Sequence, residues 1–492
     1  MLTRLRRSGG DSPPGEAPSL LVNTGWLMAS RLVQAVLGWG GTVLIARSLD
    51  TDGFGRFTLI FTVLGVMSIV TDMGIGRIAV RGMLDEEGRD TSHFAGAYLV
   101  LRSLMGVVGY VLAVAIVFLF GYPPEVVAAT AVAGIVVMLA TPSSALDVVF
   151  QARMRMGTVS ACGVVGLLGQ FALTAAIAAA GGSLLLFTIP AVAAQVIILA
   201  FKAPVAHRLV PLRLVVDRRL WGSMLREAIP LSLGIGLATV YYRADAIMLS
   251  KLDSFEAVGL YGVSYKFIDI VHFAATAVTV PLLTVLVRSW PHDVTAFRDA
   301  ARRGAMLLGI LGGLAAVGLI GFARPLTELL YGADYAESAR ATQVLVVAQV
   351  LTLFATLVLT CLIAVDRHRA YALVTLTGLV LNIGANFVLI PRYSYEGAAY
   401  ATLGAELVVL SALLFLLRRV PQLAPFGIGR LVVAPIAVVV AVVAGRAADL
   451  AVPWVRAAVL AFVVFLAVAF LGGLTAAAGL RGPSRRTSGS AA

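Results

Sequence analysis

Residues 454–478 read WVRAAVLAFVVFLAVAFLGGLTAAA, an apolar run in which Arg456 is the only charged residue. A helix of about 20 apolar residues crosses the hydrocarbon core of a bilayer. Similar runs fill most of the chain, which is 60% hydrophobic and 13% charged with a mean hydropathy of +0.94. Backbone N–H and C=O groups find no water in lipid, so we expect each run to be a helix. The composition therefore predicts an all-α polytopic membrane protein.

Fourteen runs of this kind are long enough to cross a bilayer. We place the spans at residues 22–46, 56–76, 93–120, 125–148, 158–180, 183–203, 226–250, 256–287, 303–323, 338–365, 370–390, 396–417, 430–448 and 454–478. A misread hairpin would reduce the number of spans to 12 or 13. The polar ends, residues 1–20 and 479–492, are expected to be cytoplasmic tails, and the first is expected to be disordered.

The distribution of Lys and Arg predicts the orientation, because cytoplasmic loops are enriched in both residues. If the N-terminus is cytoplasmic, inner segments hold 26 of the 38 basic residues and outer segments hold 8. The outer residues are Arg47, Arg56, Lys251, Arg324, Arg340, Arg392, Arg446 and Arg456. This split predicts that both termini are cytoplasmic. The net charge of +12 then reflects membrane orientation and anionic lipids, which argues against nucleic acid as a partner.

The chain also contains a short internal repeat. Residues 47–57 read RSLDTDGFGRF and residues 250–261 read SKLDSFEAVGLY, so Leu-Asp is followed in both by Gly-x-aromatic. The offset of about 203 residues equals six spans, an even number, so the copies have the same orientation unless the similarity is chance. Parallel repeats place a substrate path between two bundles. The predicted parts are an N-terminal six-helix bundle (21–203), a cytoplasmic linker (204–225), a C-terminal six-helix bundle (226–420) and two further helices (428–478).

Several enzyme and cofactor signatures are missing from the sequence. Cys162 and Cys361 both lie inside predicted spans, so neither a disulfide framework nor a metal cluster is indicated. The chain has no Gly-rich phosphate loop, no HExxH motif and no CxxC motif. The longest loop between spans, 204–225, is too short for a catalytic domain. We therefore expect neither an enzyme nor a bound cofactor.

Several motifs resemble the multidrug/oligosaccharidyl-lipid/polysaccharide (MOP) exporter superfamily, and within it the polysaccharide flippases of the O-antigen (Wzx) type. Residues 72–77 (DMGIGR) resemble an Asp-Leu-Gly-Leu motif that ends the second helix of that family, and residues 242–248 (YRADAIM) resemble part of its seventh. Residues 330–332 (LYG) resemble its loop before the tenth helix. Residues 381–402 (LNIGANFVLIPRYSYEGAAYAT) resemble its most specific pattern, although Ser394 stands where the family prefers glycine. The resemblance covers roughly residues 20–420.

The resemblance implies a MOP/MATE-like fold and a flippase function. Such proteins move an undecaprenyl-pyrophosphate-linked oligosaccharide to the outer leaflet of the bacterial inner membrane by alternating access. The product enters O-antigen, capsule or exopolysaccharide synthesis, which suggests the polymerase and chain-length regulator of that pathway as partners, beside membrane lipids. The glycan, the energy source and the oligomeric state do not follow from the sequence.

Four basic residues remain after the 26 inner and 8 outer ones are counted, and they lie inside predicted spans away from the span ends: Arg31, Arg102, Arg243 and Lys266. Charges inside a membrane usually face the bundle interior, and an arginine fork bonds two phosphate oxygens. We expect Arg31, Arg243 and Lys266 to line a cavity and to attract the pyrophosphate, with Arg102 as a weaker candidate. The alternatives are an interior ion pair or a side chain that extends to the membrane surface.

The acidic residues within spans are candidates for ion coupling. Asp245, Asp269 and Glu406 are the expected buried acids, and Lys266, Asp269 and His272 share a helix face. They fit a relay coupled to H⁺ or Na⁺, or a salt bridge that fixes the helix. Asp245 needs a partner on another helix, because Arg243 is only two residues away. Four tyrosines near these acids fit sugar stacking or an interfacial belt: Tyr241, Tyr242, Tyr261 and Tyr265.

Three other functions compete with polysaccharide export. A multidrug extruder of the same superfamily usually has 12 spans, so the two extra helices argue against it. A lipid II flippase has 14 spans and a cationic cavity, and is the nearest competitor. A scaffold that transports nothing is the third, although such a protein has little reason to keep charges inside its spans.

Overall fold

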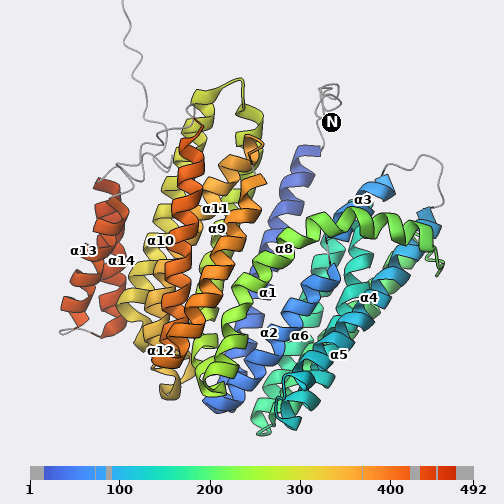
Figure 1. Cartoon of the computed structure of the whole chain (residues 1–492), viewed down its shortest axis with the longest axis horizontal. Helices are drawn as coiled ribbons and strands as arrows, with labels where there is room; N and C mark the ends of the chain where they lie inside the picture. The colour runs from blue at the N-terminus through green and yellow to red at the C-terminus, as the bar shows by residue number, and fades with distance from the viewer. Residues whose placement is uncertain are drawn as a thin grey trace, which may run out of the picture. The chain divides into compact units, whose positions relative to one another are not determined.

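The computed structural model describes residues 16–72, 74–84, 91–367, 369–420, 433–449 and 453–471 (Figure 1). These ranges contain helices and turns and no strand. The α-helices are α1 (Glu16–Ser48), α2 (Thr51–Asp72), α3 (Ile75–Leu84), α4 (Thr91–Leu119), α5 (Pro124–Ala152), α6 (Met156–Ala179), α7 (Leu184–Leu209), α8 (Arg218–Leu252), α9 (Phe255–Ser289), α10 (Val294–Tyr331), α11 (Ser338–Ala364), α12 (Arg369–Arg418), α13 (Val433–Asp449) and α14 (Trp454–Leu471). The 3₁₀ turn η2 (Ala333–Tyr335) precedes α11.

The predicted all-α fold is confirmed. By length and hydropathy, nine of the described helices qualify as membrane spans. Each predicted span coincides with one helix, except that α12 contains two spans, 370–390 and 396–417. The short helix α3 was not predicted, because its residues were assigned to the loop after the second span. Most of the predicted tail 1–20 and all of the predicted tail 479–492 lie outside the described residues.

The chain reverses within α12 at Ser394, where φ is 54° and ψ is −138°. A side chain is strained in this conformation and glycine is not, which explains why glycine is preferred at this position in the resembled family. The Ser394 hydroxyl donates to the Asp253 carboxylate. The two arms of the hairpin are in contact, because a Cβ at Gly378 would meet the side chain of Val409.

The described residues form two compact units. The first comprises residues 1–48 and 67–233, and the second comprises residues 49–66 and 234–492. The predicted linker 204–225 is mostly helical, because α7 extends to Leu209 and α8 begins at Arg218. The Asp217 carboxylate starts α8 early by accepting the N–H groups of Arg219 (3.1 Å) and Leu220 (3.0 Å).

The two copies of the internal repeat cap their helices in the same way. The Asp50 carboxylate accepts the N–H of Gly53 at 2.8 Å and starts α2. The Ser254 hydroxyl accepts the N–H of Ala257 at 3.1 Å and starts α9. Asp and Ser are preferred at this position because their oxygens satisfy N–H groups that lack a partner within the helix. Both repeated loops therefore start a helix with the same kind of side-chain N-cap.

The two helix starts also contact each other within the second unit. A Cβ at Gly55 would overlap the carbonyl of Phe255, and a Cβ at Gly259 would overlap the carbonyl of Thr51. The contact is reciprocal, since Thr51 and Phe255 occupy equivalent positions in the repeat, as do Gly55 and Gly259. Small residues permit this backbone approach between membrane helices. The wider division into two six-helix bundles stays a prediction.

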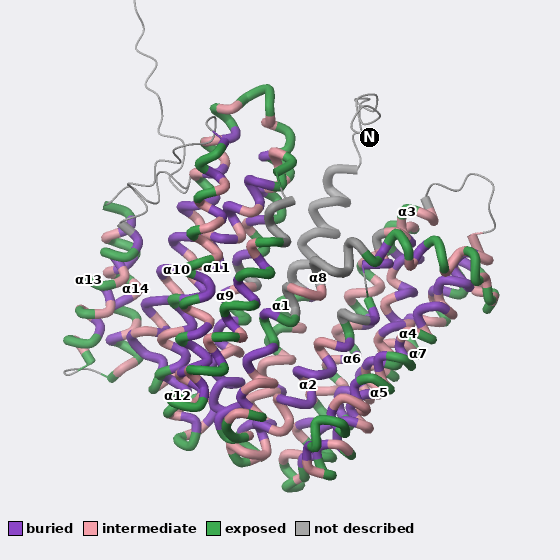
Figure 2. The backbone as a smooth tube through the Cα atoms, viewed as in Figure 1, coloured by how far each residue is buried: buried purple, intermediate pink, exposed green. Residues whose placement is uncertain are grey.

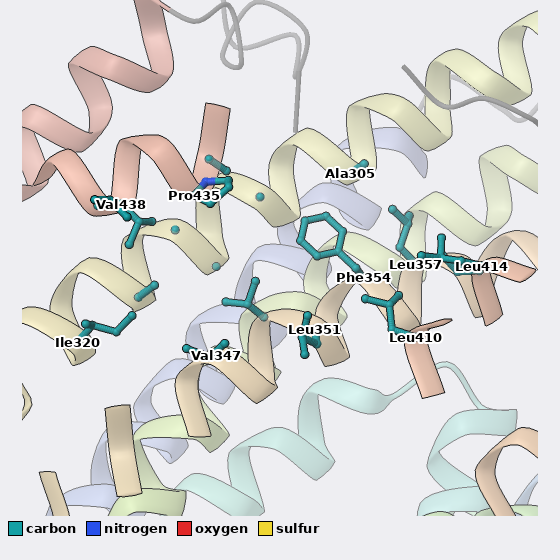
Figure 3. A pocket seen from close by; sticks show the side chains of 18 of the residues that line it. Ala305, Ile320, Val347, Leu351, Phe354, Leu357, Leu410, Leu414, Pro435 and Val438 are labelled. Carbon is teal, nitrogen blue, oxygen red and sulfur yellow. The ribbon is translucent and has the colours of Figure 1, made fainter. Parts of the chain in front are cut away.

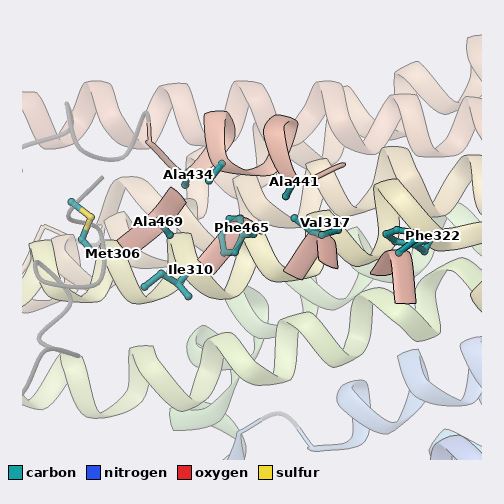
Figure 4. Close-up of a cluster of buried hydrophobic side chains, with 11 residues drawn as sticks. Met306, Ile310, Val317, Phe322, Ala434, Ala441, Phe465 and Ala469 are labelled. Carbon is teal, nitrogen blue, oxygen red and sulfur yellow. The ribbon is translucent and has the colours of Figure 1, made fainter. Parts of the chain in front are cut away.

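The second unit has an extended apolar core around α10. Helices α13 and α14, drawn in red in Figure 1, pack on α10 through a cluster of buried residues. Figure 4 shows the Phe465 ring within this cluster, and the ring occupies the space where a side chain at Gly313 would lie. Buried residues run along much of α10 and α11 in Figure 2. The two C-terminal helices are therefore firmly attached to the second unit.

Candidate functional site

Asp245 on α8 is a fully buried carboxylate in the second unit, with 1% of its surface exposed. Its Oδ2 accepts hydrogen bonds from Tyr261 (2.7 Å), Thr402 (2.8 Å) and Tyr265 (3.3 Å). Its Oδ1 accepts from the amide of Asn386 at 2.8 Å. All four donors are uncharged, and Asp245 forms no ion pair with any residue that the structure describes. Hydrogen bonds alone therefore satisfy this buried carboxyl group.

Three helices bring these partners together. Tyr261 and Tyr265 lie one turn apart on α9 and so share a face toward α8. Asn386 lies on the first arm of the α12 hairpin and Thr402 on the second. The turn at Ser394 sets the two arms side by side, so both reach the same carboxylate.

A second asparagine extends this network of oxygen atoms. The Asn386 amide also donates to Asn382 Oδ1 at 3.1 Å, and the Asn382 amide donates to the Thr402 hydroxyl at 3.4 Å. The Asn386 Oδ1 atom is buried and accepts no hydrogen bond. A buried polar atom without a partner is costly, so a cation or a hydrogen-bond donor beside Asn386 Oδ1 would stabilise this network. One carboxylate with several neutral oxygens is a donor set for a hard monovalent cation.

Glu406 is a second buried acid, one turn beyond Thr402 on α12. It is 3% exposed and its Oε1 accepts the hydroxyl of Tyr241 at 3.0 Å. Thr352 on α11 also hydrogen-bonds to this carboxyl group. Tyr241 lies one turn before Asp245 on α8. The networks of the two buried acids are therefore one helical turn apart, and both join α8 to α12.

The predicted relay along α9 is more open. Lys266 is half-buried, Asp269 is exposed and His272 is half-buried. Within the described residues, no salt bridge joins Lys266 to Asp269, so the predicted helix-fixing ion pair is absent. The imidazole of His272 lies 3.4 Å from the amide of Gln349 and against the ring of Tyr242. Asp269 is the one expected buried acid that is exposed instead.

The predicted phosphate-binding residues differ in their surroundings. Arg31 on α1 and Arg243 on α8 are exposed, and neither forms an ion pair with a described residue. Arg102 on α4 is 2% exposed, and its guanidinium contacts Asp72 Oδ1 at 2.8 Å and Ser144 Oγ at 2.7 Å. It also donates to the backbone carbonyl of Thr71 at 2.6 Å. Arg102 is thus held by its own unit and offers little to a substrate.

Sequence reasoning missed a second buried cation in the first unit. Lys202, near the end of the predicted span 183–203, was counted with the inner cations, but α7 extends past it and its ammonium is buried. It lies 2.7 Å from Asp147 Oδ1 and donates to the Ser143 hydroxyl at 3.0 Å. Three further residues of the site were not predicted from the sequence: Asn382, Asn386 and Thr402. The motif at 381–402 contains all three and is the signal that pointed to them.

Three of the four tyrosines hydrogen-bond to buried acids, and sugar stacking or an interfacial belt stays a prediction for the set. The hydroxyls of Tyr241, Tyr261 and Tyr265 donate to the carboxylates of Glu406 and Asp245. They belong to the polar network inside the unit, and only Tyr242 is exposed.

Comparison with known proteins agrees with the resemblance. A family model described as "Polysaccharide biosynthesis protein" matches residues 20–287. The structure is similar to the lipid II flippase MurJ in an inward closed conformation, with a TM-score of 0.76 at 12% identity, over 91% of this chain and 98% of that one. It is also similar to an inward-facing multidrug resistance MATE family transporter of the MOP superfamily, with a TM-score of 0.68 at 14% identity, over 79% and 95% of the two chains.

A third similar structure is a MOP superfamily transporter from Pyrococcus furiosus, with a TM-score of 0.54 at 16% identity, over 81% of this chain and 95% of that one. No curated protein matches the chain in sequence. At these identities the solved structures show the fold alone. The predicted MOP/MATE-like fold is confirmed.

Proposed function

Because the chain belongs to the polysaccharide biosynthesis protein family, whose model covers residues 20–287, we propose that it is a flippase for a lipid-linked oligosaccharide. The substrate is an undecaprenyl-pyrophosphate-linked repeat unit, moved from the cytoplasmic to the outer leaflet of a bacterial inner membrane by alternating access. Family membership is the observation that carries this proposal. The chain has many apolar helices and is a multi-pass membrane protein. The distribution of its arginines supports cytoplasmic termini.

The pyrophosphate is recognised by cations that the protein itself does not neutralise. Arg31, Arg243 and Lys266 meet this condition, since none of them forms an ion pair with a described residue. A guanidinium bonds two phosphate oxygens at once, so in the second unit Arg243 contributes most to holding the head group, while Arg31 of the first unit is a separate candidate. Arg102 is left out of this role, because its two terminal nitrogens already donate to Asp72, Ser144 and the Thr71 carbonyl and its Nε is buried.

The energy for transport comes from a cation that binds at Asp245. A buried carboxylate without a counter-charge is costly, and a bound Na⁺ removes that cost. The unpartnered Asn386 Oδ1 and the oxygens of Asn382 and Thr402 supply further ligands close by. Glu406 and His272 are the protonatable groups on the neighbouring turns and tune the site. Asp269 is exposed and serves as a control position rather than a ligand.

The test is flipping of a fluorescent undecaprenyl-pyrophosphate-linked sugar in liposomes that contain the purified protein. We expect the wild-type protein to expose the sugar to a membrane-impermeant reagent, and the Arg243→Gln and Lys266→Gln variants to slow the exchange. Arg392→Gln, a change at a predicted outer position, is the control and should leave the rate unchanged. Liposomes with correctly inserted wild-type protein but no exchange would contradict the flippase proposal.

A lipid II flippase is the second candidate, and one observation favours it. The MurJ structure covers 91% of this chain, against 79% for the inward-facing MATE transporter, so more of the chain has a counterpart in the former. Growth of a strain depleted of its own lipid II flippase separates the candidates. Rescue of growth would assign lipid II as the substrate, and failure of an inserted protein to rescue it would favour the polysaccharide precursor.

A further inference from the structure

Three of the eight predicted outer cations line one cavity in the second unit. Arg324 from the end of α10, Arg340 from the start of α11 and Arg446 from the end of α13 border a space of about 760 Å³. Trp454, the first residue of α14, completes the wall. The positive-inside rule opposes arginines on the outer side, so this gathering calls for another explanation.

The cavity carries both signs of charge in equal number. Glu328, Glu337 and Asp449 line it beside the three arginines. Arg324 contacts Glu328 at 2.8 Å, and Arg340 contacts Glu396, outside the cavity, at 3.4 Å. Arg446 and Asp449 are exposed and form no ion pair with a described residue. The cavity therefore offers a free guanidinium and a free carboxylate on the same helix, α13.

A long apolar groove of about 470 Å³ runs along the same helices. It lies between α10, α11, the second arm of α12 and α13, and its lining is almost entirely aliphatic. Figure 3 shows Phe354 and Leu351 on one side and Pro435 and Val438 on the other. From Ala305 to Ile320 on α10 the groove is about 22 Å long, more than the ~15 Å depth of one leaflet.

The groove leads into the charged cavity. On α11, Val347 in the groove is one turn after Gln343 in the cavity, and on α10 Ile320 in the groove precedes Arg324 in the cavity across a kink at Phe322. The Gln343 amide donates to the carbonyl of Ile320 at 2.9 Å and ties the two helices together at this junction. Positions one turn apart share a helix face, so the two spaces form one amphipathic site.

We propose that this site binds a zwitterionic membrane phospholipid of the phosphatidylethanolamine class. One acyl chain lies in the aliphatic groove. The phosphate is bound by Arg446 with Arg340, and the ammonium donates hydrogen bonds to Asp449 and Glu337. Trp454 lies at the membrane surface, where its apolar ring and polar N–H are both accommodated.

Charge balance selects this head group over the other membrane lipids. A pyrophosphate or phosphatidylglycerol head carries negative charge only and would leave Glu337 and Asp449 facing an anion. A choline head is zwitterionic but has no N–H to donate to a carboxylate. The inference holds whether or not the chain is a flippase.

Native mass spectrometry of the purified protein tests this inference directly. The delipidated protein is incubated with equal amounts of phosphatidylethanolamine, phosphatidylglycerol and phosphatidylcholine, together with undecaprenyl phosphate. We expect phosphatidylethanolamine to be retained about tenfold more than the others, the effect of one charged hydrogen bond. Arg446→Gln should reduce retention of every phospholipid, while Asp449→Asn with Glu337→Gln should abolish only the preference for the ethanolamine head.

Two further variants test the groove and provide a control outside the cavity. Val347→Trp fills the groove from its open side and should reduce retention without changing the head-group preference. Arg456→Gln removes an exposed arginine on α14 that does not line the cavity, and should change nothing. Equal retention of all three phospholipids by the wild-type protein, or retention of undecaprenyl phosphate in their place, would overturn the proposal.

Discussion

The two units bury opposite charges, and they neutralise them in different ways. In the first unit the buried charges are cations, Arg102 and Lys202, and each contacts an acid at 2.7–2.8 Å. In the second unit the buried charges are acids, Asp245 and Glu406, and each is satisfied by neutral donors alone.

We propose that this difference separates structural charges from functional ones. A buried ion pair that is complete within its unit ties helices together and has no need of a ligand. A buried carboxylate without a counter-charge is costly unless something neutralises it. We infer that the charges of the first unit hold its helices in place, whereas those of the second unit exchange a cation.

The largest expected effect comes from breaking the Lys202–Asp147 pair. Lys202→Met should lower the free energy of unfolding by about 3 kcal/mol, because Asp147 then stays inside without its counter-ion. Lys202→Met combined with Asp147→Leu should recover most of that loss, because both charges are removed together. Chemical unfolding of the purified protein measures both variants. If the single and double variants were equally unstable, the unpaired Asp147 charge would not be the source of the lost stability.

A cation should stabilise the protein through Asp245 alone. At a concentration 100 times its dissociation constant, Na⁺ should add about 2.7 kcal/mol to the stability of the folded state. The thermal midpoint should rise in NaCl relative to N-methylglucamine chloride for the wild-type protein and for Asp269→Asn. For Asp245→Asn it should not rise. A shift of the same size in all three proteins would mean that the salt acts elsewhere.

Relieving the strain at Ser394 should have a smaller effect. A non-glycine residue in such a conformation costs about 1–3 kcal/mol, and Ser394→Gly removes that cost but loses the hydrogen bond to Asp253. Ser394→Ala loses the bond and keeps the strain. The thermal midpoint of the glycine variant should therefore be higher than that of the alanine variant. The reverse order would show that the backbone at Ser394 is not strained.

The smallest effect concerns acid stability, and here we expect both units to behave alike. Hydrogen bonds from the backbone lower the pKa of Asp217 in the first unit and of Asp293 in the second. Their contribution is present above the unfolded pKa of about 4 and is lost as the pH falls through the lower folded value. Asp217→Asn and Asp293→Asn should each weaken the fall in thermal midpoint between about pH 5 and pH 2.

Hydropathy predicted the spans well because a bilayer constrains every backbone group in the same way. Lys202 was misjudged as an inner cation near the end of span 183–203, because α7 continues past it to Leu209. The partners of Asp245 could not be read from periodicity. Thr402 lies 157 residues away in the chain, and the contact depends on how separate helices pack. The motif around Asn386 and Thr402 marked the right residues without revealing what they contact.

The measurement that tests the central claim most directly is flipping driven by an ion gradient. Liposomes containing the wild-type protein, Asp245→Asn or Asp269→Asn receive an inward or outward Na⁺ gradient, and exposure of a lipid-linked fluorescent sugar is followed with time. The account predicts that the gradient accelerates flipping by the wild-type protein and Asp269→Asn at least about tenfold, and that Asp245→Asn does not respond. Acceleration of Asp245→Asn to the same extent, or a wild-type rate that ignores the gradient, would contradict it.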